Sequence, residues 1–203
     1  MLSPGLKAHV IPPPLGIVVI IVRLNFPVTL SLIHLVSVFV AGNLAMIKMS
    51  DTLMYLGQLL SIITPLYFPN DKLSMIIETG DVGPRFSALP FDHLIFTGST
   101  DTGRKVMENA AKNLTPVTLE LGGKCPAIIT ENFPLKKAVE RILYVKQFNA
   151  GQICTSVDYV FVPQSHLERF VLGRESKHQA RCVLFSSGVR ARLAQNDHHP
   201  LVP

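Results

Sequence analysis

In the first 170 positions, apolar residues form short continuous runs. Longer stretches lie between these runs, and proline, glycine and capping residues mark their ends. A continuous β-branched run such as GIVVIIV at 16–22 predicts a strand buried on both faces, as in a parallel sheet. By this reasoning we expect strands over 16–22, 45–49, 72–78, 91–98, 116–121, 126–130 and 157–163. Strands that alternate with helices at this spacing predict an α/β fold with right-handed crossovers.

The helices expected between these strands have recognisable ends. Pro27 opens the first helix, and AGN at 41–43 ends it. Ser50 or Asp51 caps the next one, and Ser99 caps a later one. The expected helices cover 27–41, about 51–63, 100–113 and 134–147. A turn and a short helix are expected over 79–89, and another short helix follows 163.

The sequence changes character from about Leu172 onward. Its apolar residues there follow the spacing of neither a helix nor a strand, and the chain ends in polar and histidine-rich residues. We therefore expect residues 172–203 to form a divergent, poorly ordered tail, such as a shifted reading frame or a misjudged gene model would produce. His198 and His199 could in principle bind a metal ion, but no set of cysteines or carboxylates accompanies them. A solvated tail is the simpler interpretation, and no metal site is predicted.

Composition and charge narrow the class of protein. Apolar residues make up 48% of the chain and charged residues 16%, so it can bury a core. Cys125, Cys154 and Cys182 have the spacing of neither a disulfide framework nor a zinc site, which favours a reducing, cytoplasmic location. Much of the net charge of +5 comes from residues 171–203, and no basic stripe accompanies aromatic residues, so no nucleic-acid partner is expected.

The most apolar stretch, residues 15–41, is the one candidate for a membrane segment. Arg23, Asn25 and Pro27 interrupt it, and the flanking apolar runs of about 8 and about 14 residues are shorter than the ~20 that a spanning helix needs. A buried strand and a buried helix explain the same residues, so no stable membrane anchor is expected. A small membrane-associated protein is the remote alternative.

One candidate for phosphate binding is FTGSTDTGRKV at 96–106. Here a strand ends at Gly98, Ser99 caps a helix, and Gly103 lies in the first turns of that helix. Free N–H groups at a helix N-terminus attract a phosphate, and a glycine permits close approach. An ordinary capped helix start is the alternative interpretation.

A second candidate is IKMSD at 47–51, at the carboxyl end of an expected strand. In parallel α/β sheets, ligands bind in the crevice at this edge. Asp51 could accept hydrogen bonds from ribose hydroxyls and would repel a 2′-phosphate, with Lys48 beside it. The alternative is a solvated strand end with a capping aspartate.

Two further residues could take part in covalent chemistry. Glu120 lies between leucines in an apolar strand, where a carboxylate is either paired or suited to act as a general base. A surface-facing strand residue is the equally weighted alternative. Cys154, just after AGQ at 150–152, is either a nucleophile or a small apolar residue that fills a core.

Taken together, these segments resemble the aldehyde dehydrogenase superfamily. The segments that carry the resemblance are, in family order, those of the oxyanion asparagine, the adenosine ribose, the cofactor phosphate, the general base and the catalytic cysteine. They are PLGIVVIIVRLNFP (14–27), GNLAMIKMSD (42–51), FTGST (96–100), LELGGK (119–124) and FNAGQICTS (148–156). The resemblance covers about residues 13–171 and is nearest to the branch that acts on aromatic and fatty aldehydes, including coniferyl aldehyde.

The resemblance implies a Rossmann-like parallel sheet with helices on both faces over residues 1–121, as the cofactor domain. A second α/β domain, the catalytic one, would begin over residues 122–171. Cys154 would be the nucleophile that forms a thiohemiacetal and then a thioester, and Glu120 would activate the hydrolytic water. Asn25 and the backbone N–H of Cys154 would hold the oxyanion.

The same resemblance implies NAD as cofactor, with NADP possible, and a small-molecule aldehyde as substrate. The family forms homodimers. The residues expected to bind the cofactor are Lys48, Asp51, Gly98, Ser99, Thr102 and Leu121. An inactive fragment that keeps at most partial dinucleotide binding is the alternative function.

Three departures from the family pattern bear on activity. Arg23 and Leu24 stand where the family has Pro-Trp before the oxyanion asparagine. The family segment that precedes PLG is absent, and so is the E-x-F-G-P segment expected after about residue 171. Without these parts we expect weaker cofactor binding and exposed apolar surface.

Overall fold

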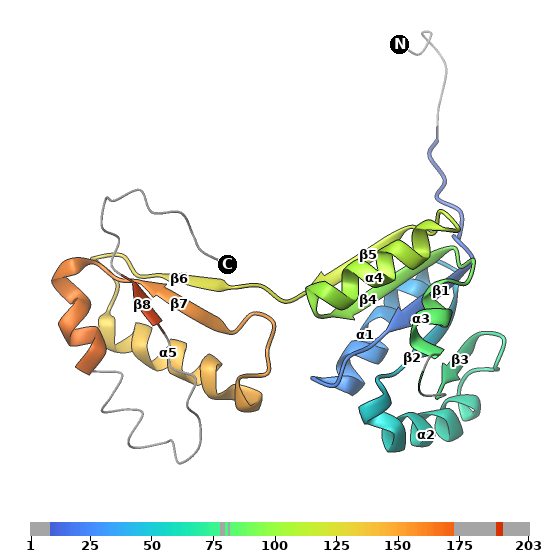
Figure 1. The fold of residues 1–203 in the computed structure, drawn as a ribbon, viewed down its shortest axis with the longest axis horizontal. Coiled ribbons are helices and arrows are strands. Elements are labelled where there is room, and N and C mark those ends of the chain that lie inside the picture. The colour runs from blue at the N-terminus through green and yellow to red at the C-terminus, as the bar shows by residue number, and fades with distance from the viewer. Residues whose placement is uncertain (1–8, 78–79, 81, 173–189, 193–203) are drawn as a thin grey trace, which may run out of the picture. The chain divides into compact units, whose positions relative to one another are not determined.

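Figure 1 shows the computed structural model, which describes residues 9–77, 80, 82–172 and 190–192. The chain divides into two compact units, Met1–Leu121 and Gly122–Pro203, and each has its own sheet. All strand pairs in the described residues are parallel. The predicted α/β fold with a parallel sheet is therefore confirmed.

The first unit contains a 5-stranded sheet in the order β3-β2-β1-β4-β5. Its strands are β1 (Ile17–Ile21), β2 (Leu44–Lys48), β3 (Leu73–Ile76), β4 (His93–Gly98) and β5 (Val117–Leu121). The chain builds outward from β1 to β3 and then returns to place β4 on the other side of β1. The strand order therefore reverses between β1 and β4, the position at which such sheets form a ligand crevice at their carboxyl edge.

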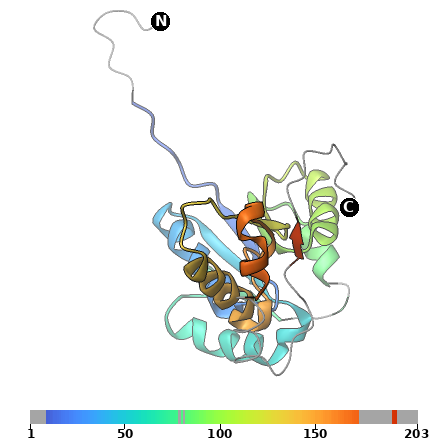
Figure 2. The ribbon, with the colours of Figure 1, turned by 90° about the vertical axis from the view of Figure 1, so that its left-hand side faces the viewer.

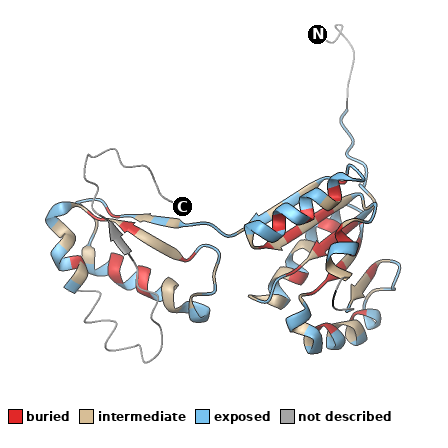
Figure 3. Ribbon diagram, in the orientation of Figure 1, coloured by how far each residue is buried: buried red, intermediate tan, exposed pale blue. Residues whose placement is uncertain are grey.

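Helices cover both faces of this sheet, as predicted (Figures 1 and 2). They are α1 (Pro27–Val40), α2 (Met54–Ile63), α3 (Val82–Ser87) and α4 (Thr100–Ala111). Val18 and Ile20 of β1 join a buried cluster with residues of α1 and α2. Val19 joins a second cluster with Phe86 of α3 and Val106 of α4. Burial on both faces explains the unbroken apolar run of β1 (Figure 3).

The start of the helix after β2 differs from the sequence prediction. It begins as a short 3₁₀ turn, Asp51–Leu53, and the side chain of neither Ser50 nor Asp51 accepts a capping hydrogen bond from a backbone N–H of the helix. Ser50 Oγ instead pairs with Thr52 Oγ1 at 2.9 Å, and the Asp51 carboxylate binds a lysine. The predicted capping role of these two residues is wrong, because closer polar partners compete for both side chains.

The apolar stretch 15–41 forms strand β1 and the 14-residue helix α1. In the part of the chain that the structure describes, no helix has both the length and the apolar character needed to cross a membrane.

The second unit contains a 3-stranded sheet in the order β6-β7-β8. Its elements are β6 (Cys125–Ile128), α5 (Leu135–Gln147), β7 (Val157–Phe161) and β8 (Arg190–Arg192). Val139 and Ile142 of α5 pack with Val160 of β7 in one buried cluster. Strand β8 was not predicted from the sequence. The rest of the expected tail, including His198 and His199, lies outside the described residues.

Candidate active site

The carboxyl edge of the first sheet gathers most of the residues expected to bind the cofactor or react. In the strand pairing, Ile21 lies opposite both Lys48 and Phe96, and Gly98 lies opposite Leu121, so the four strand ends meet at one edge. The residues at or just after these ends are Asn25, Lys48, Asp51, Gly98, Ser99, Glu120 and Leu121, and Thr102 follows in α4. Cys154 belongs to the second unit.

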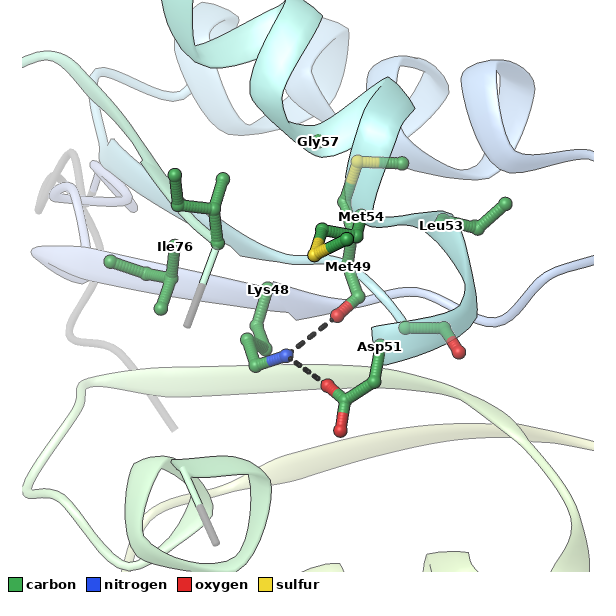
Figure 4. Close-up of a pocket in the computed structure, with 9 residues that line it drawn as sticks. Lys48, Met49, Asp51, Leu53, Met54, Gly57 and Ile76 are labelled. Carbon is green, nitrogen blue, oxygen red and sulfur yellow. Dashed lines mark hydrogen bonds and ion pairs between the residues drawn. The ribbon is translucent and has the colours of Figure 1, made fainter. Parts of the chain in front are cut away.

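Lys48 and Asp51 form an ion pair at the end of β2 (Figure 4). The Lys48 ammonium donates to Asp51 Oδ1 at 2.9 Å and to the Met49 carbonyl at 2.7 Å. Asp51 Oδ2 accepts from the Gly80 backbone N–H at 3.2 Å. The pair lines a small pocket together with Met54 and neighbouring residues. The alternative of a solvated strand end with a capping aspartate is wrong, because the Lys48 side chain is only 4% exposed.

The ion pair predicts a pH-dependent contribution to stability. The hydrogen bond from Lys48 holds the pKa of Asp51 below 3.8, although burial opposes the shift. The stabilisation is therefore fully present above pH 3.8 and is lost as the pH falls through the lowered pKa. Because the Asp51 side chain is 50% exposed, we expect Asp51→Asn to lower the free energy of unfolding by at most about 1 kcal/mol at pH 7.

Urea titrations at pH 7 and at pH 2.5 test this prediction. The difference between the parent protein and Asp51→Asn should shrink at the lower pH, because protonation of the aspartate weakens its bond to Lys48. Asp71→Asn, which changes an exposed carboxylate of the same unit, is the matched control. An equal deficit for Asp51→Asn at both pH values would contradict the assignment.

Helix α4 begins as predicted. Ser99 Oγ accepts a hydrogen bond from the Thr102 backbone N–H at 3.4 Å, so the predicted cap is confirmed. A side chain at Gly98 would overlap the ring of Phe96, and one at Gly103 would lie 2.7 Å from the Leu121 side chain. Both glycines therefore allow close packing inside the unit, and Gly103 brings α4 close to β5.

The segment that carries Asn25 contains a strained residue. Asn25 is half-buried, and the next residue, Phe26, has φ 56° and ψ 49° in the left-handed region. This conformation costs a bulky residue about 1–2 kcal/mol and persists only where its surroundings fix it. Glu120 lies on β5 and is exposed. This position agrees with the second interpretation of Glu120, a strand residue that faces the surface.

Cys154 is exposed, so the interpretation that it fills a core is wrong. A run of left-handed residues precedes it: Asn149 (φ 48°), Ala150 (φ 57°) and Gly151 (φ 78°). Asparagine and glycine tolerate this region, whereas alanine does so at a cost in energy. Strained backbone of this kind clusters at sites where function fixes the geometry.

A turn presents Cys154 just before the amino end of β7, the middle strand of the second sheet. The Ser156 backbone N–H donates to the Ile153 carbonyl at 3.1 Å, which leaves Cys154 inside the turn, just before β7. Cys125, the first residue of β6, donates from Sγ to the Cys154 carbonyl at 3.3 Å. The thiol of Cys154 is thus exposed while its backbone is held on both sides.

Relief of the strain at Ala150 is a direct test of this loop. We expect Ala150→Gly to raise the free energy of unfolding by about 0.5–1 kcal/mol. Glycine adopts the left-handed conformation without strain, and this relief outweighs the greater freedom of glycine in the unfolded chain. Ala138→Gly in α5 is the control and should lower stability by at least about 1 kcal/mol, since glycine weakens a helix interior. Urea denaturation measures both. Destabilisation by Ala150→Gly would show that the left-handed geometry is not that of the protein in solution.

Sequence reasoning missed three contributors to these sites. Cys125 gave no signal, because no short spacing links it to Cys154. The Gly80 N–H that binds Asp51 comes from a distant loop. The strain at Ala150 had a partial signal, because Asn149 and Gly151 flank it and both residue types favour left-handed backbone. The structure describes no cluster of His, Cys, Asp or Glu side chains that could hold a metal ion, within the residues it places.

The first unit defines the class of this protein: a doubly wound α/β domain whose parallel strands reverse order beside an accessible carboxyl edge. The family model for the aldehyde dehydrogenase family matches residues 1–181, and the chain belongs to this family. The match begins before and ends after the range 13–171 inferred from the motifs.

Individual relatives agree with this assignment. The chain is 50% identical over 165 residues to a probable coniferyl aldehyde dehydrogenase of Pseudomonas aeruginosa, covering 81% of this chain and 35% of that protein. It is 41% identical over 166 residues to aldehyde dehydrogenase family 3 member A2 of Rattus norvegicus, covering 81% and 34%. A putative aldehyde dehydrogenase AldX of Bacillus subtilis is 33% identical over 199 residues, covering 98% and 42%. The last alignment extends into the stretch after residue 172.

Solved structures share the fold. A substrate-bound AldH of Staphylococcus aureus superposes with a TM-score of 0.77 at 33% identity, covering 83% of this chain and 37% of that one. Betaine aldehyde dehydrogenase of Staphylococcus aureus in complex with NAD+ gives a TM-score of 0.75 at 29% identity, covering 82% and 34%. The chain thus spans about a third of the length of the first curated relatives it matches.

Proposed function

We propose that this chain supplies the cofactor-binding edge and the reacting thiol for oxidation of an aromatic or aliphatic aldehyde to the carboxylic acid with NAD(P)+. The observation that carries the proposal is the exposed Cys154 thiol, held in a turn after strained backbone in a chain of this family. Similarity to the coniferyl and family 3 member A2 enzymes supports an aromatic or fatty substrate. Free thiols at Cys125 and Cys154 suit a reducing, cytoplasmic location.

The residues at the carboxyl edge fit a dinucleotide. Of the three N–H groups of the Lys48 ammonium, the hydrogen bonds described above use two, so one can donate to a ribose hydroxyl. Asp51 can accept from the same ribose. The N-terminus of α4, beside Ser99 and Thr102, has other backbone N–H groups in its first turn that can donate to the phosphates. Gly98 and Leu121 at the ends of β4 and β5 form the neighbouring edge.

The chemistry of the reaction is assigned to three side chains. The Cys154 thiolate attacks the aldehyde carbon, and the resulting thiohemiacetal oxyanion accepts hydrogen bonds from the Asn25 amide and the Cys154 backbone N–H. Bound NAD(P)+ supplies the acceptor for the hydride that this carbon loses as the thioester forms. The Glu120 carboxylate then takes a proton from water, which attacks the thioester and releases the acid and the thiolate.

Formation of NADH with coniferyl aldehyde, followed by absorbance, tests the proposal on the whole chain. Turnover that depends on both substrates supports it. Binding of NADH without turnover would instead support the alternative of an inactive fragment that keeps the cofactor edge. Failure to bind NADH or NADPH would contradict the proposal and would leave an inactive fragment that has lost the cofactor site.

The role of Asp51 in cofactor choice gives a separate prediction. We expect Asp51→Asn to raise the affinity for NADPH relative to NADH by about fivefold, because removing an exposed charge beside a 2′-phosphate is worth roughly 1 kcal/mol. Fluorescence titration of both nucleotides measures the ratio, with Asp71→Asn as control. An unchanged ratio would remove Asp51 from the ribose site.

A further inference from the structure

The Cys125 side chain contacts the backbone of Cys154 at the amino ends of the paired strands β6 and β7, although 29 positions separate the two residues. Cys125 begins β6 opposite Val157 of β7, and Cys154 lies in the turn that leads into β7. The pairing register shifts between Cys125 and Pro126. Such an irregularity bends a strand and redirects a side chain out of the regular ladder. Here the redirected thiol contacts the backbone of the turn that carries Cys154.

The contact places the two thiols within reach of each other. Cys125 Sγ lies 3.3 Å from the Cys154 carbonyl oxygen. The carbonyl carbon and the Cβ of Cys154 are both bonded to the same Cα, so rotation about χ1 of Cys154 can turn its sulfur toward that of Cys125. A disulfide needs Cα atoms roughly 4.4–6.8 Å apart, and paired strands such as β6 and β7 lie about 4.7–4.9 Å apart.

The two thiols differ in access to solvent. Cys154 is exposed, whereas Cys125 is half-buried. A dissolved oxidant therefore reaches Cys154 more readily than Cys125. An accessible cysteine beside a second, less accessible one is the arrangement found in reversible thiol oxidation.

From this arrangement we propose that Cys125 and Cys154 form a reversible disulfide, with a hydroperoxide as oxidant and Cys125 as the resolving thiol. The Cys154 thiolate attacks one peroxide oxygen, which breaks the O–O bond and gives a sulfenic acid and hydroxide. The Cys125 thiol then attacks the sulfenyl sulfur: the S–S bond forms, the S–O bond breaks, and the oxygen leaves as water. Two thiols lose two electrons, and hydrogen peroxide becomes two waters.

The disulfide has two consequences. It ties up the thiol that would attack an aldehyde, so oxidised protein would be inactive until a dithiol reduces it. It also removes the sulfenic acid before a second peroxide converts it to the irreversible sulfinic acid. The inference goes beyond the proposed function, and its chemistry can be tested without any aldehyde.

Peptide mass mapping of the full chain tests the proposal. A Cys182→Ser background leaves only the two thiols of interest. After treatment with hydrogen peroxide, alkylation and trypsin, Cys125 lies in peptide 125–136 and Cys154 in peptide 147–169, and neither peptide contains methionine. We expect the two peptides linked, at their summed mass less two hydrogen atoms, and separated again by dithiothreitol.

Two comparisons can overturn the proposal. In a further Cys125→Ser variant we expect at least about tenfold more sulfinic acid on Cys154, because the sulfenic acid is no longer resolved. In urea, the linked pair should be largely lost, since folding brings the thiols together. Equal sulfinic acid with and without Cys125, a linked pair that forms equally well in urea, or linkage only between two chains would each refute it.

Discussion

Replacing Cys154 by alanine is expected to lower the rate of aldehyde-dependent NADH formation by at least about 10³-fold. The reason is chemical, because the oxidation proceeds through a carbon–sulfur bond and a methyl side chain cannot form one. The exposed position of Cys154 means that the change should remove the nucleophile without creating a cavity in a core. Absorbance of NADH with coniferyl aldehyde and saturating NAD+ measures the loss.

The controls separate loss of chemistry from loss of folding. Cys182→Ser, which also removes one thiol, should keep the parent rate. Cys154→Ala should still bind NADH with the parent affinity, since the residues assigned to the cofactor lie in the first unit. Iodoacetamide should label Cys154 faster than Cys125 in the folded parent, because Cys125 is half-buried. A Cys154→Ala protein that oxidises aldehyde at the parent rate would contradict the assigned mechanism.

Replacing Leu94 by alanine is expected to lower the free energy of unfolding of the first unit by about 2–5 kcal/mol. Leu94 has 0% exposure on β4 and joins Val19 and Phe86 in the cluster beneath α3 and α4. Truncation removes buried methyl groups and leaves a cavity that a packed sheet cannot close. Because domains are stable by only about 5–15 kcal/mol, such a loss is a large share of the total.

Leu66→Ala provides a matched control, because the same atoms are removed from a side chain that is 76% exposed. We expect that variant to lie within about 0.5 kcal/mol of the parent. Urea denaturation compares the two, and NADH titration tests whether Leu94→Ala also weakens binding, since β4 leads directly into Ser99. Similar stability for the two variants would contradict the buried cluster.

The apolar pattern of the sequence predicted the strands of the first unit and its α/β class. The run at 16–22 identified a strand buried on both faces, and the structure places it at the centre of the sheet. The cap at Ser99 and the opening of α1 at Pro27 were also predicted correctly. These features are local, because burial period, capping and proline geometry act within a few residues of each other.

Motifs in the sequence likewise determined the family, and the family model and relatives agree with it. The tertiary structure decided how particular side chains are used. In it, Asp51 pairs with Lys48, although the sequence predicted a capping role. The lack of a side chain at Gly98 and Gly103 makes room for the side chains of Phe96 and Leu121.

Cys154 shows the division most clearly. The residues around it left it either catalytic or buried, the resemblance to the family favoured a nucleophile, and the folded loop exposes it. The same fold brought Cys125 to its backbone from 29 positions away and set Ala150 in the left-handed region. Periodicity carries no information about such contacts, because they depend on which strands pair and on how a turn closes between them. The sequence by itself therefore determined the elements and the family, and tertiary packing decided the environment of the thiol.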